Sequence, residues 1–349
     1  MDISQAQSQF GASGTYLNTA SMGLPPRATV DAVTESIARW GRGELGAGDF
    51  DHAVARSREL YADLVGAPVQ NVAIGSQTSQ LLGHVAANVP DGAEVLVATG
   101  DFTSVLFPFL AQQARGVQVR ELPMGELASA ISASTYAVVS SAVQSADGAL
   151  LDLGQIREAC EQTGTLSVID VTQAAGWLPV CADDFDVTVC SAYKWLLAPR
   201  GVAYLSIKPH VRDGMLVHSA SWAGGQDVWD SIYGTPLRLD SGARGLDVSP
   251  AWFSWVGQVP SLELLRDVGV PAIQEHNVAL ADAFLARLGR DPAGSTIVSV
   301  PADDSAQSAL REAGVSFALR AGQVRLSFHL YNTEDDVNRV ADLLQLSRS

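Results

Sequence analysis

The sequence predicts an α/β protein that has a large domain built on a mostly parallel sheet and a smaller α+β domain near its C-terminal end. Three observations predict this. Short apolar runs alternate with amphipathic segments between about residues 70 and 207. After residue 250 the pattern changes to long helical segments followed by short strands. The 349 residues also exceed one ordinary hydrophobic core, so we expect a large domain over 15–248 and a small one over 249–349 with 1–14.

The large domain is predicted from strands and helices that alternate along the chain. Apolar, β-branched runs predict strands over 71–75, 94–100, 136–142, 166–171 and 186–192. Amphipathic segments predict helices over 76–89, 103–115 and about 153–164. Because strands joined by crossover helices run parallel and are covered on both faces, this order predicts a largely parallel sheet. The run over 201–207 follows after a short connection, which favours an antiparallel strand.

The small domain is predicted from the remaining segments. Helices are expected around 252–267 and 270–289, strands over 295–300, 315–322 and 323–328, and a last helix over 334–346. Asn332 and Thr333 precede that last helix and are expected to cap it, with acidic residues favourable in its first turn.

Composition excludes several classes of function. Hydrophobic residues make up 47% and charged residues 17%, which is typical of a globular chain. The net charge of −16 argues against a broad nucleic-acid surface, because neutralising phosphates needs clustered Lys and Arg. No apolar run reaches the roughly 18 residues of a membrane span. The six histidines are scattered, so no metal site is predicted.

The cysteines and the N-terminal segment indicate the compartment. Cys160, Cys181 and Cys190 show no CxxC spacing and lie in or beside helix and strand patterns. We interpret them as buried thiols of a protein in the reducing cytoplasm. The first residues, "MDISQAQSQFGASG", lack the basic and apolar segments of a secretory signal.

One lysine, Lys194, lies in the apolar stretch "SAYKWLLAPRG" between two predicted strands. Taken alone, it is either a surface side chain whose stem is covered by apolar neighbours or a desolvated amine. Desolvation lowers the pKa of a lysine and makes its neutral amine available to form an imine.

Two further groups follow neighbouring predicted strands, where α/β sheets bind ligands. Gly75-Ser76-Gln77-Thr78 opens a helix and offers N–H groups and hydroxyls to a phosphate, with an ordinary N-cap as the alternative. Asp170 ends a buried strand and is either a functional carboxylate or one tied to backbone amides. A phosphate cradle, a buried acid and a desolvated lysine have one joint explanation, pyridoxal 5′-phosphate.

The segment "LSVIDVTQAAGWLPVCADDFDVTVCSAYKWLLAPRGVAYL" resembles the cofactor segment of the class V aminotransferases, which include cysteine desulfurases, isopenicillin N epimerase-like proteins and kynureninase. The shared signature is Asp-x-x-Gln/His followed after about twenty residues by Ser-x-(His/Tyr)-Lys. The resemblance runs from "YLNTASMGLPP" to "VRLSFHLYNTEDDVNRV", almost the whole chain. It implies the type I fold of pyridoxal phosphate enzymes.

Residue by residue, the resemblance implies a set of roles in cofactor binding. Lys194 is expected to be the Schiff-base lysine, Asp170 the partner of the pyridine nitrogen and Gln173 the partner of the ring hydroxyl. The phosphate is expected to meet a further group of side chains, namely Ser76, Gln77, Thr78 and Tyr193. Phe102 is expected to stack on the pyridine ring; a different register would place Thr103 there, which cannot stack.

The resemblance also nominates residues for the substrate and for a second subunit. Arg325 in "VRLSFHLYNT" matches the arginine that receives the α-carboxylate of the substrate, with an ion pair to an acidic residue as the alternative. Ser249 in "GLDVSP" is expected near the phosphate of a neighbouring subunit, which implies a homodimer; a plain helix cap is the alternative. Other polar residues are expected around the ring or the mouth of the site, namely 18–21, Ser140, Ser141, Gln144 and Ser145.

The expected function is chemistry at Cα of an amino acid. Desulfurases need a cysteine between strands of the small domain, and "ALRAG" passes directly to "QVRLSF" without one. Transamination is our first expectation, because the chain shows no added catalytic group. Side-chain elimination, for example by a C–S lyase, and epimerisation remain open, since all begin with removal of the Cα proton. A non-catalytic relative is disfavoured, because the key residues are all present.

Overall fold

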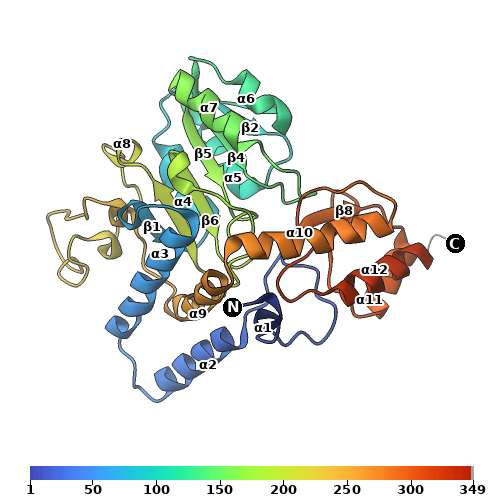
Figure 1. The fold of residues 1–349 in the computed structure, drawn as a ribbon. Helices are drawn as coiled ribbons and strands as arrows, with labels where there is room; N and C mark the ends of the chain where they lie inside the picture. The colour runs from blue at the N-terminus through green and yellow to red at the C-terminus, as the bar shows by residue number, and fades with distance from the viewer. Residues whose placement is uncertain (347–349) are drawn as a thin grey trace.

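The computed structural model describes residues 1–346 and, within them, contains one large and one small sheet (Figure 1). The large sheet has seven strands in the order β1-β7-β6-β5-β4-β2-β3. In chain order these are β1 (Val72–Gly75), β2 (Glu94–Ala98), β3 (Gln118–Leu122), β4 (Thr135–Ser141), β5 (Leu166–Asp170), β6 (Val187–Ser191) and β7 (Ala203–Ile207).

The sheet is parallel except at β7, which runs antiparallel to both β6 and β1. The prediction of a largely parallel sheet with one antiparallel strand is therefore confirmed. Because the other six strands point the same way, their carboxyl ends lie at one edge of the sheet. Asp170 at the end of β5 and Lys194 just after β6 consequently lie at neighbouring positions on that edge.

Helices cover both faces of the large sheet. The apolar residues of each strand alternate, so that Val95 and Val97 of β2 pack on one side while Leu96 and Ala98 pack on the other. One layer contains α4 (Thr78–Ala87) and α5 (Thr103–Leu110). The other contains α3 (Asp51–Val65), α7 (Leu153–Thr163) and α9 (Trp252–Val268).

The small sheet has the order β8-β10-β9 and is antiparallel. Its core is shared with helices at the right of Figure 1. These elements are α10 (Val270–Arg287), β8 (Ile297–Val300), α11 (Asp304–Glu312), β9 (Ala318–Arg320), β10 (Gln323–Ser327) and α12 (Glu334–Leu346). The boundary between the two domains stays a prediction. The remaining helices are α1 (Ile3–Gln7), α2 (Arg27–Gly41), α6 (Leu127–Ala130) and α8 (Pro209–Arg212).

The structure differs from the sequence predictions in a few elements. β3 was not predicted, because this edge strand is mostly exposed and its sequence, QVREL, carries little apolar signal. The helix expected over 103–115 ends as an α-helix at Leu110 and continues as a 3₁₀ turn over 111–115. The strand expected over 315–322 is reduced to β9. Thr333 does cap α12, since its hydroxyl accepts from Asp336 N at 3.4 Å, whereas Asn332 Oδ1 accepts from His329 N.

The connection between β6 and β7, residues 192–202, is mostly buried, with Arg200 exposed, although it has no regular secondary structure. Gly23 N donates to the carbonyl of Tyr193, and Ser261 Oγ donates to that of Leu197. A Cβ on Gly23 would lie 2.0 Å from the carbonyl oxygen of Lys194, so only glycine fits. Leu197 has a φ of 57°, a conformation that non-glycine residues rarely adopt. We refer to residues 192–202 as the lysine loop.

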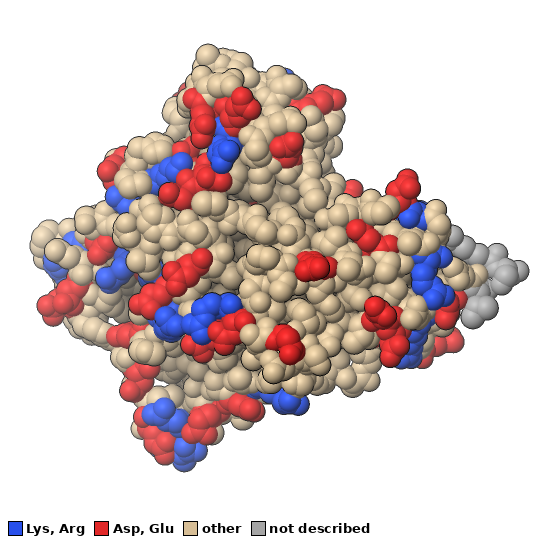
Figure 2. Space-filling model, viewed as in Figure 1, with Lys and Arg blue, Asp and Glu red and all other residues tan. Residues whose placement is uncertain are grey.

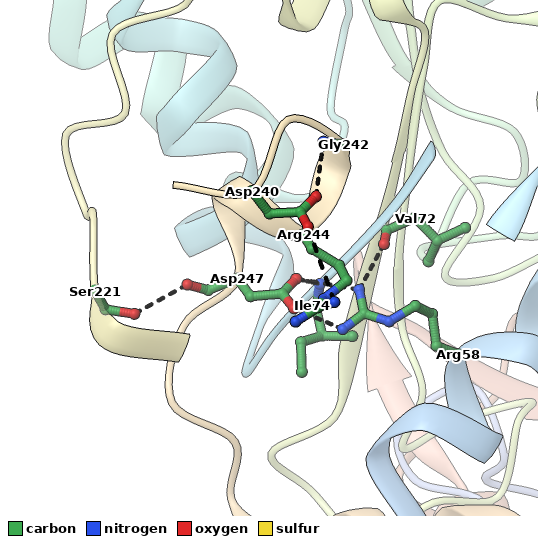
Figure 3. A network of polar contacts seen from close by, with 8 residues as sticks. All are labelled: Arg58, Val72, Ile74, Ser221, Asp240, Gly242, Arg244 and Asp247. Atoms are coloured by element: carbon green, nitrogen blue, oxygen red, sulfur yellow. Dashed lines mark hydrogen bonds and ion pairs between the residues drawn. The ribbon is translucent and has the colours of Figure 1, made fainter. Parts of the chain in front are cut away.

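A buried ion pair ties the long segment after α8 back to β1 (Figure 3). Both oxygens of Asp247 accept from the guanidinium of Arg58, at 2.6 and 3.2 Å, and Asp247 Oδ1 also accepts from Ile74 N at 2.8 Å. Arg58 also donates to the carbonyl of Val72 at 2.6 Å. Since both charges are almost completely buried, each depends on the other for compensation.

No helix within residues 1–346 is long and apolar enough to cross a bilayer. On the face shown in Figure 2, basic side chains lie in small groups among acidic ones, and much of the middle of the face carries no charge.

We predict that Asp247→Ala destabilises the protein by about 3–5 kcal/mol, because Arg58 would be left buried and unpaired. Urea unfolding should show this as a lower midpoint with an unchanged slope. As a control, Asp267→Ala removes one side of the exposed pair with Arg266 and should leave the midpoint unchanged. Equal midpoints for Asp247→Ala and the parent would contradict the anchoring role of the pair.

Candidate functional site

A cavity of about 170 Å³ opens at the carboxyl edge of the large sheet. It receives residues from the ends of several strands, from the start of α4 and from the lysine loop. Its lining consists of Gln77, Thr78, Phe102, Ser104, Ser141, Ser145, Asp170, Thr172, Gln173, Ser191, Tyr193, Lys194 and Arg200. The structure therefore brings together seven of the predicted cofactor residues, from Gln77 to Lys194.

Lys194 is a buried amine and not a surface side chain, since it is 5% exposed. Its Nζ lies 5.2 Å from the ring centre of Phe102 and 5.7 Å from that of Tyr193, and within residues 1–346 it makes no hydrogen bond. Burial lowers the pKa of Lys194 to about 8, although the nearby carboxylate of Asp170 partly opposes this. At pH 7 about a tenth of the amine is then neutral, far more than for an exposed lysine.

Asp170 supplies the buried carboxylate on the adjacent strand. Its Oδ1 accepts from Thr172 N at 2.7 Å. Burial raises the pKa of Asp170 to about 6, against the hydrogen bonds from Thr172 and the charge of Lys194. A protonated ring nitrogen in the cavity would stabilise the ionised carboxylate, so the group fits a cationic partner.

The side-chain amide of Gln173 has a determined orientation. The indole Nε1 of Trp195 can only donate and lies 2.7 Å from one amide atom, which must therefore be Oε1. Nε2 then donates to the carbonyl of Ala20 at 3.0 Å. Because an amide nitrogen carries two hydrogens, one N–H of Gln173 remains for an acceptor in the cavity.

Hydroxyl groups surround the start of α4. Thr78 N donates to Ser191 Oγ at 3.1 Å, and Thr172 Oγ1 accepts from Ser191 N at 2.9 Å. Together with backbone N–H groups of the first helical turn, these hydroxyls can bind a phosphate. Ser76, in contrast, donates with both N and Oγ to Gln80 Oε1 and lies outside the cavity lining, so its role stays a prediction.

The sequence reasoning missed several residues of the lining. Ser104, Thr172, Ser191 and Arg200 were not proposed. Ser191 could have been found, because it occupies the serine position of the Ser-x-Tyr-Lys signature. Arg200 lies with its guanidinium 5.2 Å from the ring centre of Tyr193, in a turn whose sequence indicates only a bend.

Phe102 lies at the mouth of the cavity and is 44% exposed. Its backbone N–H donates to Asp101, whose carboxylate also accepts from Ser141 N and Oγ, so the loop after β2 is tied to the end of β4. Phe102 lines the cavity and Thr103 does not, which supports Phe102 as the stacking residue. Among the other polar residues, Ser141 and Ser145 line the cavity, whereas Ser140 and Gln144 do not.

Arg325 lies beside the cavity on β10 and is 1% exposed. It donates to the carbonyl of Ser145 at 2.5 Å and to Ser21 Oγ at 2.7 Å, and its Nε has no partner. No carboxylate within residues 1–346 pairs with it, so the alternative of an internal ion pair has no support there. Burial lowers the pKa of Arg325 to about 10. Ser249 is exposed and lies outside the cavity lining, and its role stays a prediction.

The comparisons with known proteins agree on one family. Residues 16–310 match the profile of the aminotransferase class-V family. The chain belongs to this family. Its relatives include an uncharacterized aminotransferase, YcbU, of Bacillus subtilis, 28% identical over 82% of this chain and 81% of that protein. Isopenicillin N epimerase of Streptomyces clavuligerus is 26% identical over 94% of this chain and 93% of that protein.

Solved structures show the same fold. The cysteine desulfurase CsdA of Escherichia coli superposes with a TM-score of 0.85 over 100% of this chain and 98% of that one, at 20% identity. The predicted fold, a large α/β domain and a small α+β domain of the pyridoxal phosphate type I class, is confirmed. Membership in the class-V family also confirms pyridoxal phosphate as the predicted cofactor.

The lining of the cavity fits this cofactor. It offers a partly neutral amine in Lys194, a buried acid in Asp170, a spare amide N–H in Gln173 and an aromatic ring in Phe102. The hydroxyls at the start of α4 complete the set with donors for an anion.

We predict that pyridoxal phosphate attaches to Lys194 of the cofactor-free protein with a rate that rises with pH and levels off above about pH 8, because only the neutral amine reacts. The chain has two lysines, Lys194 and Lys208, which makes borohydride labelling decisive. Label on Lys194 in the parent and in Lys208→Arg is expected. A rate that keeps rising to about pH 10, as for an unperturbed lysine, would contradict the buried amine.

Proposed function

We propose that this class-V protein is an aminotransferase, which takes the amino group from an α-amino acid and passes it to an α-keto acid. The observation that carries the proposal is the pairing of a buried amine, Lys194, with a buried guanidinium, Arg325, that has no acidic partner within residues 1–346. These two groups suit an α-amino acid, because the amine of Lys194 can act at Cα and the guanidinium of Arg325 can bind the carboxylate.

Each residue has a part in this proposal. Bound pyridoxal phosphate supplies an electron sink for the bonds at Cα. Lys194 Nζ would hold the cofactor and, as a free neutral amine, would be the base that removes the Cα proton and the acid that returns it. Asp170 would stabilise a protonated ring nitrogen by its charge. Arg325 binds the substrate carboxylate and so orients the Cα–H bond toward Lys194.

The other residues that line the cavity support transamination as the reaction type. The ionisable side chains there are Asp170, Tyr193, Lys194 and Arg200. Burial raises the pKa of Tyr193, which makes it a poor second base. One amine therefore carries out the proton transfers, as transamination requires. Side-chain elimination and epimerisation start with the same proton removal and are the alternatives.

The cysteine that the desulfurase reaction needs between the strands of the small domain is missing. The turn between β9 and β10 consists of Ala321 and Gly322, with no cysteine. Cys160 and Cys190 are buried, and burial raises the pKa of both thiols. The expectation that all three thiols are buried is wrong for Cys181, which is exposed. It lies next to Gly66, on the α3 side of the molecule and away from the cavity lining.

The test is a panel of amino acids, each offered with and without a keto acid, while keto-acid, ammonia and sulfide products are measured. Keto-acid formation that requires an added keto acid is expected. Ammonia or sulfide released without one would replace transamination by elimination, and loss of stereochemical purity alone would replace it by epimerisation.

The same assay tests Arg325. Arg325→Ala should lower kcat/KM for amino acids by the equivalent of roughly 2–5 kcal/mol of binding free energy, because the substrate carboxylate would be buried unpaired. Arg325→Lys should remain impaired, since the ammonium lacks the two parallel donors. An amine without a carboxylate should react poorly with the parent. Equal turnover of an amino acid and its decarboxylated amine by the parent would show that Arg325 has a structural role.

We further propose that the enzyme is a homodimer in which exposed Ser249 approaches the phosphate of the partner subunit. Ser249 follows the segment anchored by Asp247, so its position relative to β1 is well determined. Light scattering should show a dimer, and Ser249→Ala should weaken cofactor binding without changing the oligomeric state. A monomer with full activity at high dilution would rule out this arrangement.

A further inference from the structure

A chain of buried hydrogen bonds leads from the small domain to Gln173. Trp195, the residue after Lys194, donates its indole N–H to Gln173 Oε1 at 2.7 Å. The carbonyl of Trp195 lies 3.1 Å from Nε2 of His329, just beyond β10, and the two rings lie 5.3 Å apart. His329 Nδ1 lies 3.4 Å from Nδ2 of Asn277 on α10. Asn277, His329 and Trp195 are fully buried, and Gln173 is almost so.

The partners determine the tautomer of His329. A carbonyl oxygen can only accept, so Nε2 must carry the proton that faces Trp195. Nδ1 is then the bare nitrogen and accepts from the Asn277 amide. Burial holds the pKa of His329 down, to about 3, so the ring stays neutral at ordinary pH. The neighbouring His276 acts in the same direction.

The backbone of His329 is held as firmly as its ring. His329 N donates to Asn332 Oδ1 at 2.9 Å, and Asn332 Nδ2 donates to the carbonyl of Tyr16 at 2.9 Å. Phe328 N donates to the carbonyl of Thr296 at the start of the small sheet. The imidazole is therefore a rigid support, because neither its main chain nor its side chain can move without leaving a buried polar group unpaired.

We propose that His329 is a positioning residue, which holds Trp195 so that the indole N–H orients the amide of Gln173 and directs its spare N–H into the cavity. This rests on the proposed function and on the contact, expected from the sequence, between that N–H and the ring hydroxyl of pyridoxal phosphate. Trp195, the residue next to Lys194 in the lysine loop, is held by two hydrogen bonds. Its carbonyl contacts His329 and its indole contacts Gln173. His329 also lies four residues beyond Arg325 on one continuous segment, so the arginine for the substrate and the support for Gln173 belong to the same element.

The inference predicts a spectroscopic change in the holoenzyme. A donor to the ring oxygen stabilises its ionised form, so loss of alignment should raise the pH midpoint of the visible cofactor band. His329→Phe removes both hydrogen bonds and should raise the midpoint by about half to one pH unit, the equivalent of one hydrogen bond. His329→Gln keeps a donor for Trp195 and an acceptor for Asn277, and should restore the parent midpoint.

Two further variants separate positioning from general destabilisation. Trp195→Phe removes the indole N–H and should shift the midpoint like His329→Phe, and the double variant should shift it no further. Val340→Ala weakens the core of the small domain and should leave the midpoint unchanged. Equal shifts in Val340→Ala and His329→Phe, or no shift in His329→Phe, would overturn the proposal.

The tautomer can be measured in the unsubstituted protein without cofactor. Nitrogen-15 NMR of histidine should show His329 with a protonated Nε2 and a bare Nδ1, unchanged from about pH 5 to about pH 8. A proton on Nδ1, or titration within this range, would refute the inference even if every variant failed to fold. A protein that shows this tautomer and binds no pyridoxal phosphate would instead refute the proposed function.

Discussion

The structure depends on the need to satisfy the backbone of the buried lysine loop. A buried connection without regular structure leaves its carbonyls without ladder partners, and each unpaired carbonyl costs free energy. Here the donors come from distant parts of the chain: Gly23 N to Tyr193, His329 to Trp195, Gln258 Nε2 to Leu196 and Ser261 Oγ to Leu197. The position of Lys194 therefore depends on the N-terminal segment, α9 and the small domain together.

Buried charges of both signs give the site its chemistry. Burial lowers the pKa of Lys194 and raises that of Asp170, so each group is held near a protonation change by the same desolvation. Arg325 stays charged because its pKa, although lowered by burial to about 10, remains well above neutral pH, and its donors meet Ser145 and Ser21. The net charge of −16 thus coexists with buried cationic side chains at the cavity and beside it.

The two domains contribute different parts of this site. The large sheet places the residues that line the cavity at one edge, since its parallel strands end together. The small domain brings Arg325 and His329 to that edge from a single segment around β10. The Arg58–Asp247 pair likewise fixes a segment in place, because it holds the residues that lead to Ser249 against β1 (Figure 3). Rigid elements therefore hold groups that a loop alone would leave too mobile.

The sequence by itself determined the sheet, the strand ends that carry Asp170 and Lys194, and the family, because apolar periodicity and motif spacing are local properties. It could not reveal β3, whose edge position removes the apolar signal, nor Arg200, which lies in an ordinary turn. The sequence also left two alternatives open, a surface side chain for Lys194 and an internal ion pair for Arg325. Only the tertiary structure decided these, because burial and the absence of an acidic partner for Arg325 within residues 1–346 depend on packing between residues far apart in the chain. The tautomer of His329 is also decided by tertiary structure, since its partners Trp195 and Asn277 are 134 and 52 residues away from it along the sequence.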